Sequence, residues 1–298
     1  MEHTGRDDSK RAETIRLAGL YANFASIASP TQETSVFYRA GLYLACAADW
    51  PAAAVAMEKV VRANDLELRL TITQIAVSKM ILNFALLQTA GYVQAQSTQP
   101  VLNGVAFGTD ERGDPYIWLG DRLLETDSEL CWPGALAVFQ AQVTMANNDG
   151  EGAFRAAQIL LGRSGWYSAR EYYYLAAARE PQNAEFAFEL GVILQTYEGD
   201  EAEALHWYQK AFDLKPTAFY AVRLAQTYQA LGQTGRALFY ADRSMELPPE
   251  DDWVRVWAGW IYRDNGRIDA ARRAFELALS MNSNNLEARN ELVMLEGK

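Results

Sequence analysis

The sequence predicts an all-α fold, a solenoid of stacked helix-turn-helix hairpins, and two series of small residues carry this prediction. One series is separated by 34, 35, 33 and 34 positions and consists of Ala135, Ala169, Ala204, Ala237 and Ala271. The other is separated by 34 positions every time and consists of Ala157, Gly191, Ala225, Gly259 and Val293. Self-similarity at such a period indicates a repeat architecture, in which each helical pair buries its apolar faces only against its neighbours.

The composition indicates a folded chain and argues against several kinds of site. The chain has 298 residues, of which 50% are hydrophobic and 22% charged, and this is enough to bury a sizeable core. Its formal charge is −11 and it has no basic stripe, so a nucleic-acid partner is not expected. Cys46 and Cys131 form no CxxC pair or His/Cys cluster, which disfavours a metal site and a disulfide-stapled secreted fold.

The membrane and targeting signals of the sequence are weak. The first sixteen residues are polar and charged, without the apolar stretch and cleavage site of a signal peptide. The longest apolar region, 68–93, is interrupted at a spacing of four or five by Gln74, Lys79, Asn83 and Gln88. This spacing indicates the solvent-exposed face of a buried or amphipathic helix rather than a transmembrane helix. A cytoplasmic protein without direct membrane insertion is therefore expected, and association with a membrane complex remains open.

The N-terminal region, residues 1–112, is expected to hold three elements. Residues 34–67 fit one degenerate hairpin, with Gly41, Ala53 and Met57 in the register of the later repeats. Residues 68–95 predict one long helix rather than a hairpin. Residues 96–112 predict a loop rich in Gly, Pro and Asp, and an insertion of this length in a repeat array usually projects from one face.

Residues 113–298 are expected to form about five hairpins and a C-terminal capping helix. Apolar residues at three- and four-residue steps predict the first helices of three hairpins within 184–197, 218–232 and 252–266. Gly232 and Gly266 stand where the chain must leave a helix with positive φ. Prolines close three of the second helices, at Pro181, Pro216 and Pro249. The last helix, 286–295, carries polar residues that would cap the stack.

These motifs resemble those of the tetratricopeptide repeat (TPR) family. In the unit that starts at Ala184, repeat positions 7, 8, 20, 24, 27 and 32 match the family after a one-residue insertion in the turn, with Leu190, Gly191, Ala204, Tyr208, Ala211 and Pro216. Later units depart from the pattern at Ser244, where alanine is usual, and at Ser283, where proline is usual. The resemblance implies a right-handed α-solenoid, in which small residues let the two helices of a hairpin approach closely and aromatic rings fill the remaining gap.

The resemblance also implies a binding surface, because the first helix of each TPR hairpin lines a concave groove. The corresponding positions give a predicted peptide-binding groove of Phe154, Arg155, Gln158, Phe188, Gln195, Phe219, Arg223, Gln226, Gln229, Trp253, Trp257, Trp260 and Arg263. Rings would supply desolvated area to a peptide, and Gln and Arg would satisfy its polar groups. Packing against the preceding hairpin is the alternative role for each ring. The Lys and Asn clamp of chaperone adaptors is missing, with Phe188, Val192, Val222 and Val256 in its place.

The sequence offers no site for catalysis. The two histidines, His3 and His206, accompany no recognisable catalytic motif, and no metal or cofactor is expected. The leading hypothesis is a non-enzymatic TPR scaffold or adaptor that binds a peptide or protein segment in its groove. The alternative is a soluble accessory or assembly part of a bacterial cell-envelope machine for polysaccharide synthesis or export, with 68–95 and the loop as docking elements. A third possibility is an enzyme with its site in the insertion at 68–115.

Overall fold

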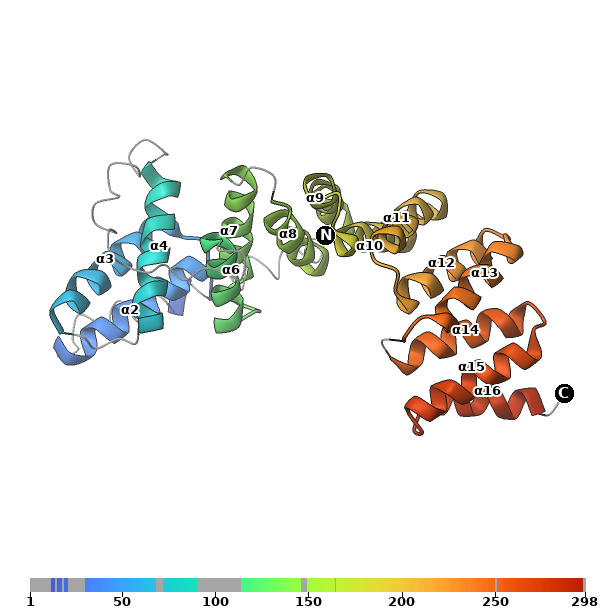
Figure 1. Ribbon diagram of the computed structural model, residues 1–298. Helices are drawn as coiled ribbons and strands as arrows, with labels where there is room; N and C mark the ends of the chain where they lie inside the picture. The colour runs from blue at the N-terminus through green and yellow to red at the C-terminus, as the bar shows by residue number, and fades with distance from the viewer. Residues whose placement is uncertain are drawn as a thin grey trace. The chain divides into compact units, whose positions relative to one another are not determined.

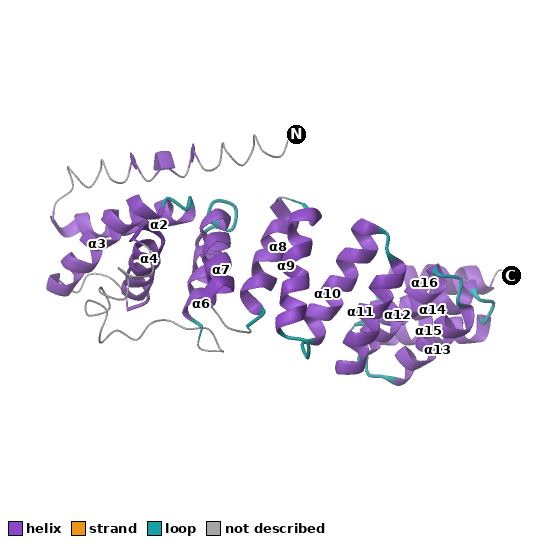
Figure 2. Ribbon diagram, turned by 90° about the horizontal axis from the view of Figure 1, so that it is seen from above, coloured by secondary structure: helices purple, strands orange, loops and turns teal. Residues whose placement is uncertain are grey.

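The fold is known from a computed structural model, which describes residues 12–13, 15–17, 19–20, 30–67, 72–90, 114–145, 149–163, 165–249 and 251–296. All regular elements within these residues are helical (Figures 1 and 2). The chain divides into two compact units, Met1–Tyr172 and Tyr173–Lys298, and each is described by itself. The boundary expected after residue 112 rests on the repeat register rather than on packing, and it stays a prediction.

The first unit is built from helices that pack on their neighbours in the sequence. These are α2 (Pro30–Cys46), α3 (Trp50–Glu67), α4 (Ile72–Ala90), α6 (Pro115–Thr126), α7 (Trp132–Met145), α8 (Glu151–Arg163) and the start of α9 (Trp166–Arg179). Helix α3 packs on both α2 and α4, and α6 packs on α7. The expected hairpin at 34–67 thus corresponds to α2 and α3. A shared core of buried residues joins α2, α3, α4, α6 and α7.

The second unit repeats one helical hairpin (Figure 1). After the end of α9 its elements are α10 (Ala184–Ile193), the π-helical turn η2 (Leu194–Glu198), α11 (Glu201–Leu214), α12 (Ala218–Ala230), α13 (Thr234–Glu246), α14 (Asp252–Asp264), α15 (Ile268–Met281) and α16 (Leu286–Glu296). The hairpins are α10 with α11, α12 with α13 and α14 with α15, and each second helix also packs on the next first helix. This confirms the predicted all-α array of hairpins.

The glycines of the 34-residue series lie where the first helix of a hairpin packs closely on the second. A Cβ atom on Gly191 of α10 would lie 2.8 Å from the ring of Tyr208 and 3.3 Å from the carbonyl oxygen of Ala204, both on α11. A Cβ on Gly259 of α14 would lie 2.4 Å from the ring of Phe275 on α15. The second helix therefore approaches so closely that its large side chain occupies the space of the missing Cβ.

The same contact recurs in the first unit, with different residue types. A Cβ on Gly120 of α6 would lie 2.3 Å from the ring of Phe139 on α7. A Cβ on Gly41 of α2 would lie 2.9 Å from the side chain of Met57 on α3. The glycine and the large residue expected from the repeat register thus meet in the degenerate N-terminal hairpin as well.

The one-residue insertion of the unit that starts at Ala184 is absorbed inside the first helix. The sequence placed it in the turn between helices, but the structure accommodates it as the π-helical turn η2, which directly continues α10. The turn ends at Gly199, whose φ of 68° lies in the left-handed region that glycine tolerates. A π-turn holds one residue more than an α-turn, so the helix takes up the extra residue without breaking.

Asn285 ties the starts of two successive first helices together. Its side-chain carbonyl accepts a hydrogen bond from the backbone N–H of Ala288 in the first turn of α16, at 2.9 Å. Its amide donates to Asp252 Oδ2 at the start of α14, at 2.6 Å, and Asn282 donates to the same oxygen at 3.0 Å. These hydrogen bonds, chiefly that from Asn285, lower the pKa of Asp252.

The outer face of α16 is less polar than the sequence suggested. Leu286, Val293 and Met294 are exposed, and Val293 keeps 64% of its surface accessible. The residues at the position of Val293 in the three preceding first helices, Gly191, Ala225 and Gly259, are buried against their own second helix. The exposed surface of the capping helix α16 therefore combines polar residues, Arg289 and Asn290, with these apolar ones.

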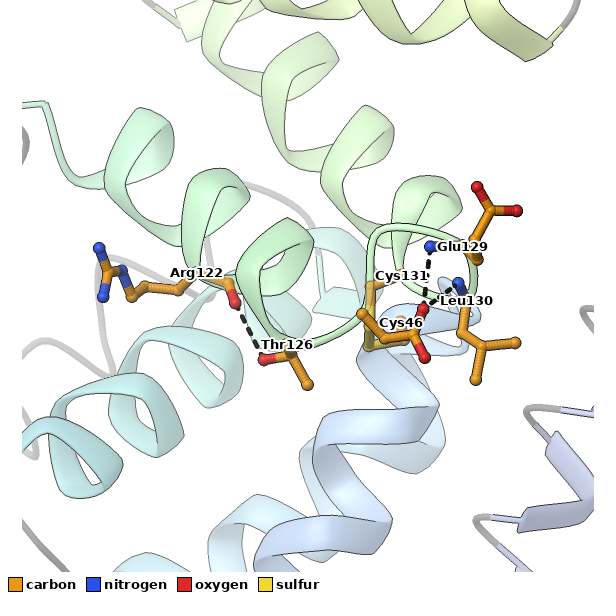
Figure 3. The surroundings of a disulfide bond; sticks show 7 residues. Cys46, Arg122, Thr126, Glu129, Leu130 and Cys131 are labelled. Carbon is orange, nitrogen blue, oxygen red and sulfur yellow. Dashed lines mark hydrogen bonds between the residues drawn. A yellow bond between two sulfur atoms is a disulfide. The ribbon is translucent and has the colours of Figure 1, made fainter.

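The structure joins Cys46 and Cys131 by a disulfide across 85 residues of sequence (Figure 3). Both cysteines are fully buried in the core of the first unit. An Asx turn leads to Cys131, since Asp127 accepts hydrogen bonds from the backbone N–H groups of Glu129 and Leu130 at 2.9 and 3.0 Å. The expectation of a chain without a disulfide staple was wrong, because the fold brings together two cysteines that no sequence spacing connects.

The apolar segment after the first hairpin is part of the core. The single helix expected at 68–95 corresponds to α4, whose residues Val77, Ile81 and Phe84 are buried. Among the described helices, none combines the length and hydropathy that crossing a bilayer requires. The loop expected at 96–112 lies outside the described residues.

We expect Gly259→Ala to destabilise the second unit by about 1 to 3 kcal/mol, because the new methyl group would overlap the buried ring of Phe275. Gly235→Ala is the matched control, since Gly235 lies in helix α13 with open space around its Cβ position. The control should be neutral or slightly stabilising. Thermal unfolding of both variants measures the difference, and equal melting temperatures would contradict the proposed close contact.

Candidate functional site

An aromatic strip runs across three successive first helices of the second unit. Phe188 of α10 lies 5.1 Å from Phe219 and 4.9 Å from Tyr220, both on α12, measured between ring centroids. Phe219 lies 5.9 Å from Trp257 of α14. Phe188 is buried, with 7% of its surface accessible, whereas Phe219, Tyr220 and Trp257 are half-buried. The strip is therefore anchored in the core at α10 and accessible on α12 and α14.

Two further tryptophans of α14 extend the aromatic surface. Trp253 and Trp260 approach edge to face with ring centroids 6.4 Å apart. Trp253 is 43% exposed, the largest exposure among the predicted groove rings. Trp260 is fixed by its indole N–H, which donates to Glu291 of α16 at 2.9 Å. Trp253 is thus the ring most available to a partner, and Trp260 contributes to packing between repeats.

Arg223 is hydrogen-bonded to uncharged polar side chains, and this network links α12 to the preceding hairpin. Its guanidinium donates to Gln195 Oε1 and Tyr208 Oη, both at 3.3 Å, and to Gln226 Oε1 at 3.2 Å. The hydroxyl of Tyr208 donates to the same oxygen of Gln195 at 3.0 Å. Arg223 makes no ion pair within the described residues, and its buried Nε has no hydrogen-bond partner there. The predicted groove residues Gln195, Arg223 and Gln226 therefore do lie together.

A second, ionic network links α14 to α16. Arg263 pairs with Glu291, whose side chain is 4% exposed, and with Asp264 at 2.8 Å. Gln229 of α12 reaches the same Asp264, with its Nε2 donating at 3.3 Å. Gln229 and Arg263, both predicted groove residues, are therefore already engaged by carboxylates of this chain. They are less free to bind a partner than the sequence suggested.

Two carboxylates belong to this face although the sequence analysis did not select them. Glu189, Arg223, Trp257 and Glu291 follow one another at intervals of 34 and occupy the same position in successive first helices. The selection favoured aromatic, glutamine and arginine side chains, so Glu189 and Glu291 were missed. The repeat register itself was the signal that could have found them.

Glu189 carries an electrostatic strain that depends on its neighbours. Burial raises the pKa of its carboxyl, and the nearby carboxylate of Glu185 raises it further, while Arg223 partly offsets both effects. Glu185 and Glu189 lie one turn apart on α10, and neither side chain makes a hydrogen bond or ion pair within the described residues. A pair of like charges at this spacing costs a helix about 0.2 to 0.5 kcal/mol.

The remaining predicted groove residues belong to the first unit. Phe154 of α8 is buried, with 4% of its surface accessible, which favours the core role for this ring. Arg155 pairs with Glu151 one turn earlier at 2.7 Å. Gln158 is exposed. These residues lie together on one helix of the first unit.

The described residues show no arrangement typical of catalysis. His206 is exposed on α11, with its ring edge-on to Trp207 at 5.6 Å. Within the described part of the chain, no three His, Cys, Asp or Glu side chains gather in a way that could hold a metal ion. The chemistry of the face is therefore that of rings, amides and a few charges, which suits recognition.

The comparisons with known proteins agree with this geometry. Residues 254–285, which span most of α14 and α15, match the family model described as a tetratricopeptide repeat. The chain is a tetratricopeptide repeat protein. No curated protein sequence matches it.

Several solved TPR structures are similar to this TPR protein. The C-terminal part of a TPR repeat-containing protein from Cytophaga hutchinsonii has a TM-score of 0.51 at 16% identity, covering 86% of this chain and 99% of that one. YrrB, described as "a TPR protein with an unusual peptide-binding site", has a TM-score of 0.48 at 19% identity, covering 59% and 90%. A thermophilic TPR protein from Thermus thermophilus, TTC0263, has a TM-score of 0.44 at 21% identity, covering 61% and 98%. At these identities the likeness concerns the fold alone.

We expect Glu189→Gln to stabilise the TPR protein at neutral pH, because the amide removes a half-buried charge and its repulsion with Glu185. The raised pKa of Glu189 means that the folded state holds a proton which the unfolded state has already lost, so stability falls as pH rises through this window. The gain from Glu189→Gln should therefore grow between about pH 4 and pH 7 and vanish below the carboxyl's ordinary pKa.

Thermal unfolding of wild type and Glu189→Gln across this pH range measures the effect. Glu276→Gln on the exposed surface of α15 is the control and should leave the pH dependence unchanged. A melting temperature of Glu189→Gln at or below that of wild type at pH 7 would contradict the proposal that the charge of Glu189 destabilises the folded state.

Proposed function

We propose that this TPR protein is a non-enzymatic scaffold or adaptor that binds a peptide or protein segment on the first-helix face of its second unit. We define this face by Phe219, Tyr220, Gln226, Trp253 and Trp257. The observation that carries the proposal is the aromatic strip that continues from α10 through α12 to α14 and remains accessible at its centre. Accessible rings backed by a rigid helical array are typical of hot spots in protein interfaces.

The polar groups beside the strip complement the rings. Gln226 is half-buried on α12, and its amide carbonyl accepts from Arg223 while the described contacts leave its N–H groups uncommitted. Such an amide can donate to the backbone carbonyl of a bound segment, which would otherwise lose its hydrogen bonds to water. Arg223 holds Gln226 in place through the network with Gln195 and Tyr208, so the donor is positioned before a partner arrives.

A double substitution tests the proposal. We expect Trp253→Ala with Trp257→Ala to lower the affinity for every captured peptide by about thirtyfold, since each ring would be a hot spot. The measurement uses the full chain on an array of synthetic peptides, followed by fluorescence titration of the peptides that bind. Phe239→Ala is the matched control, because Phe239 is a 55% exposed ring on the second helix α13. If the double variant captures the peptides as well as wild type does, this face is not their binding site.

A second candidate function is favoured by the disulfide. Stable disulfides occur mainly in proteins of oxidising compartments, such as the bacterial periplasm. The buried Cys46–Cys131 link therefore favours an extracytoplasmic site of action over the cytoplasmic localisation that the sequence suggested. This supports the alternative of an accessory part of a bacterial cell-envelope machine. The buried apolar residues of α4 do not support a docking role for that helix.

The oxidation state in the source cells tests the compartment. We expect both cysteines to resist alkylation when cells are quenched in acid and denatured without reductant, and to react fully after reduction. A Cys46→Ser variant supplies the control, because its lone Cys131 should label without reductant. Full labelling of the unreduced wild-type chain would contradict an oxidising compartment, and mass spectrometry of the two cysteine peptides distinguishes the results.

A further inference from the structure

We infer that the segment bound on the first-helix face is basic at the end that meets α10, where a lysine or arginine side chain lies between Glu185, Glu189 and the neighbouring rings. This inference rests on the proposed function and adds the charge of the partner. Glu185 and Glu189 occupy the same positions on α10 that Trp253 and Trp257 occupy on α14, 68 residues later. Glu185 and Glu189 therefore lie at the α10 end of the first-helix face, and Trp253 and Trp257 lie at its α14 end.

The carboxylates of this pair lack a cation within the described chain. Neither forms a hydrogen bond or an ion pair through its side chain, although many other carboxylates of the second unit do. The charge of Arg223 acts on Glu189, but its guanidinium donates hydrogen bonds to Gln195, Tyr208 and Gln226 instead. The repulsion within the pair is thus left for a partner to relieve.

The rings beside the pair favour a cation for a second, independent reason. Phe188 lies between Glu185 and Glu189 in the sequence of α10 and is itself buried, but it packs against Tyr220 at 4.9 Å and Phe219 at 5.1 Å, and these two rings are partly accessible. Ring faces attract ammonium and guanidinium groups, and the attraction increases where water is partly excluded. A lysine or arginine of the partner would therefore meet carboxylates and aromatic faces together, while its neighbouring apolar residues meet Phe219 and Trp257.

The net charge of the second unit also favours a basic partner. Residues 173–298 contain 19 Asp and Glu against 13 Lys and Arg, a formal charge of −6. Such a field accelerates the approach of a cationic segment and opposes an acidic one. An acidic segment would meet Arg223 and Arg263, and it would have to displace the hydrogen bonds and ion pairs that already hold these side chains.

The test begins with an array of synthetic peptides of varied charge probed with the full chain. We expect the captured peptides to be enriched in Lys and Arg relative to the array. For one captured peptide, its basic residues are then replaced by Gln, and both forms are titrated against wild type, Glu185→Gln with Glu189→Gln, and the control Glu276→Gln. The basic form should bind the double variant about three- to tenfold more weakly than wild type. The Gln form should bind both proteins equally.

Salt separates this contribution from a change in packing. The affinity of the basic peptide for wild type should fall as NaCl rises, and the double variant should show a weaker dependence. Captured peptides that are neutral or acidic, or an equal loss of both peptide forms in the double variant, would overturn the inference while leaving the proposed function standing. If Trp253→Ala with Trp257→Ala retains full capture, or if no peptide is captured at all, the proposed function fails and the inference fails with it.

Discussion

The fold depends on one contact that recurs in four hairpins, between a small residue on the first helix and a large side chain on the second. Where the small residue is glycine, as in Gly191 and Gly259, the ring of Tyr208 or Phe275 occupies the space that a methyl group would fill. Closer helices bury more apolar surface per residue, and this compensates for the conformational freedom that glycine loses on folding. Because each hairpin of the second unit packs on the next, the contact also sets the position of each first helix of that unit relative to its neighbours.

That contact is also why so much of the fold could be predicted. The contact requires particular residue types at fixed separations along the chain, and these separations can be read as a period in a single sequence. The features that the sequence did not reveal have no period. Cys46 and Cys131 lie 85 residues apart and meet only because α2 and the turn before α7 share a core. The π-turn at Leu194–Glu198 places an insertion inside a helix, where counting residues cannot distinguish it from a longer loop.

The candidate site was only partly predictable, because its side chains serve two purposes. The repeat register identified the face, but it could not tell which members are held by their own chain. Arg263 and Trp260 are engaged by Glu291, which is 3% exposed, and Arg223 is held by Gln195 and Tyr208. Trp253 lies more open. Ion pairs and hydrogen bonds between distant residues decide this difference, and a rule based on residue type overlooked the carboxylates that make them.

Asn285 also determines how the end of the array opens. The terminal helix of a solenoid is packed on one side only, so local unfolding normally starts there and moves inward. Here the residue that caps α16 also holds Asp252 in the first turn of α14, so α16 cannot separate at its start without disturbing the preceding repeat. We therefore expect α14 and α16 to open together, so that backbone amides in the interiors of the two helices exchange with deuterium at similar rates.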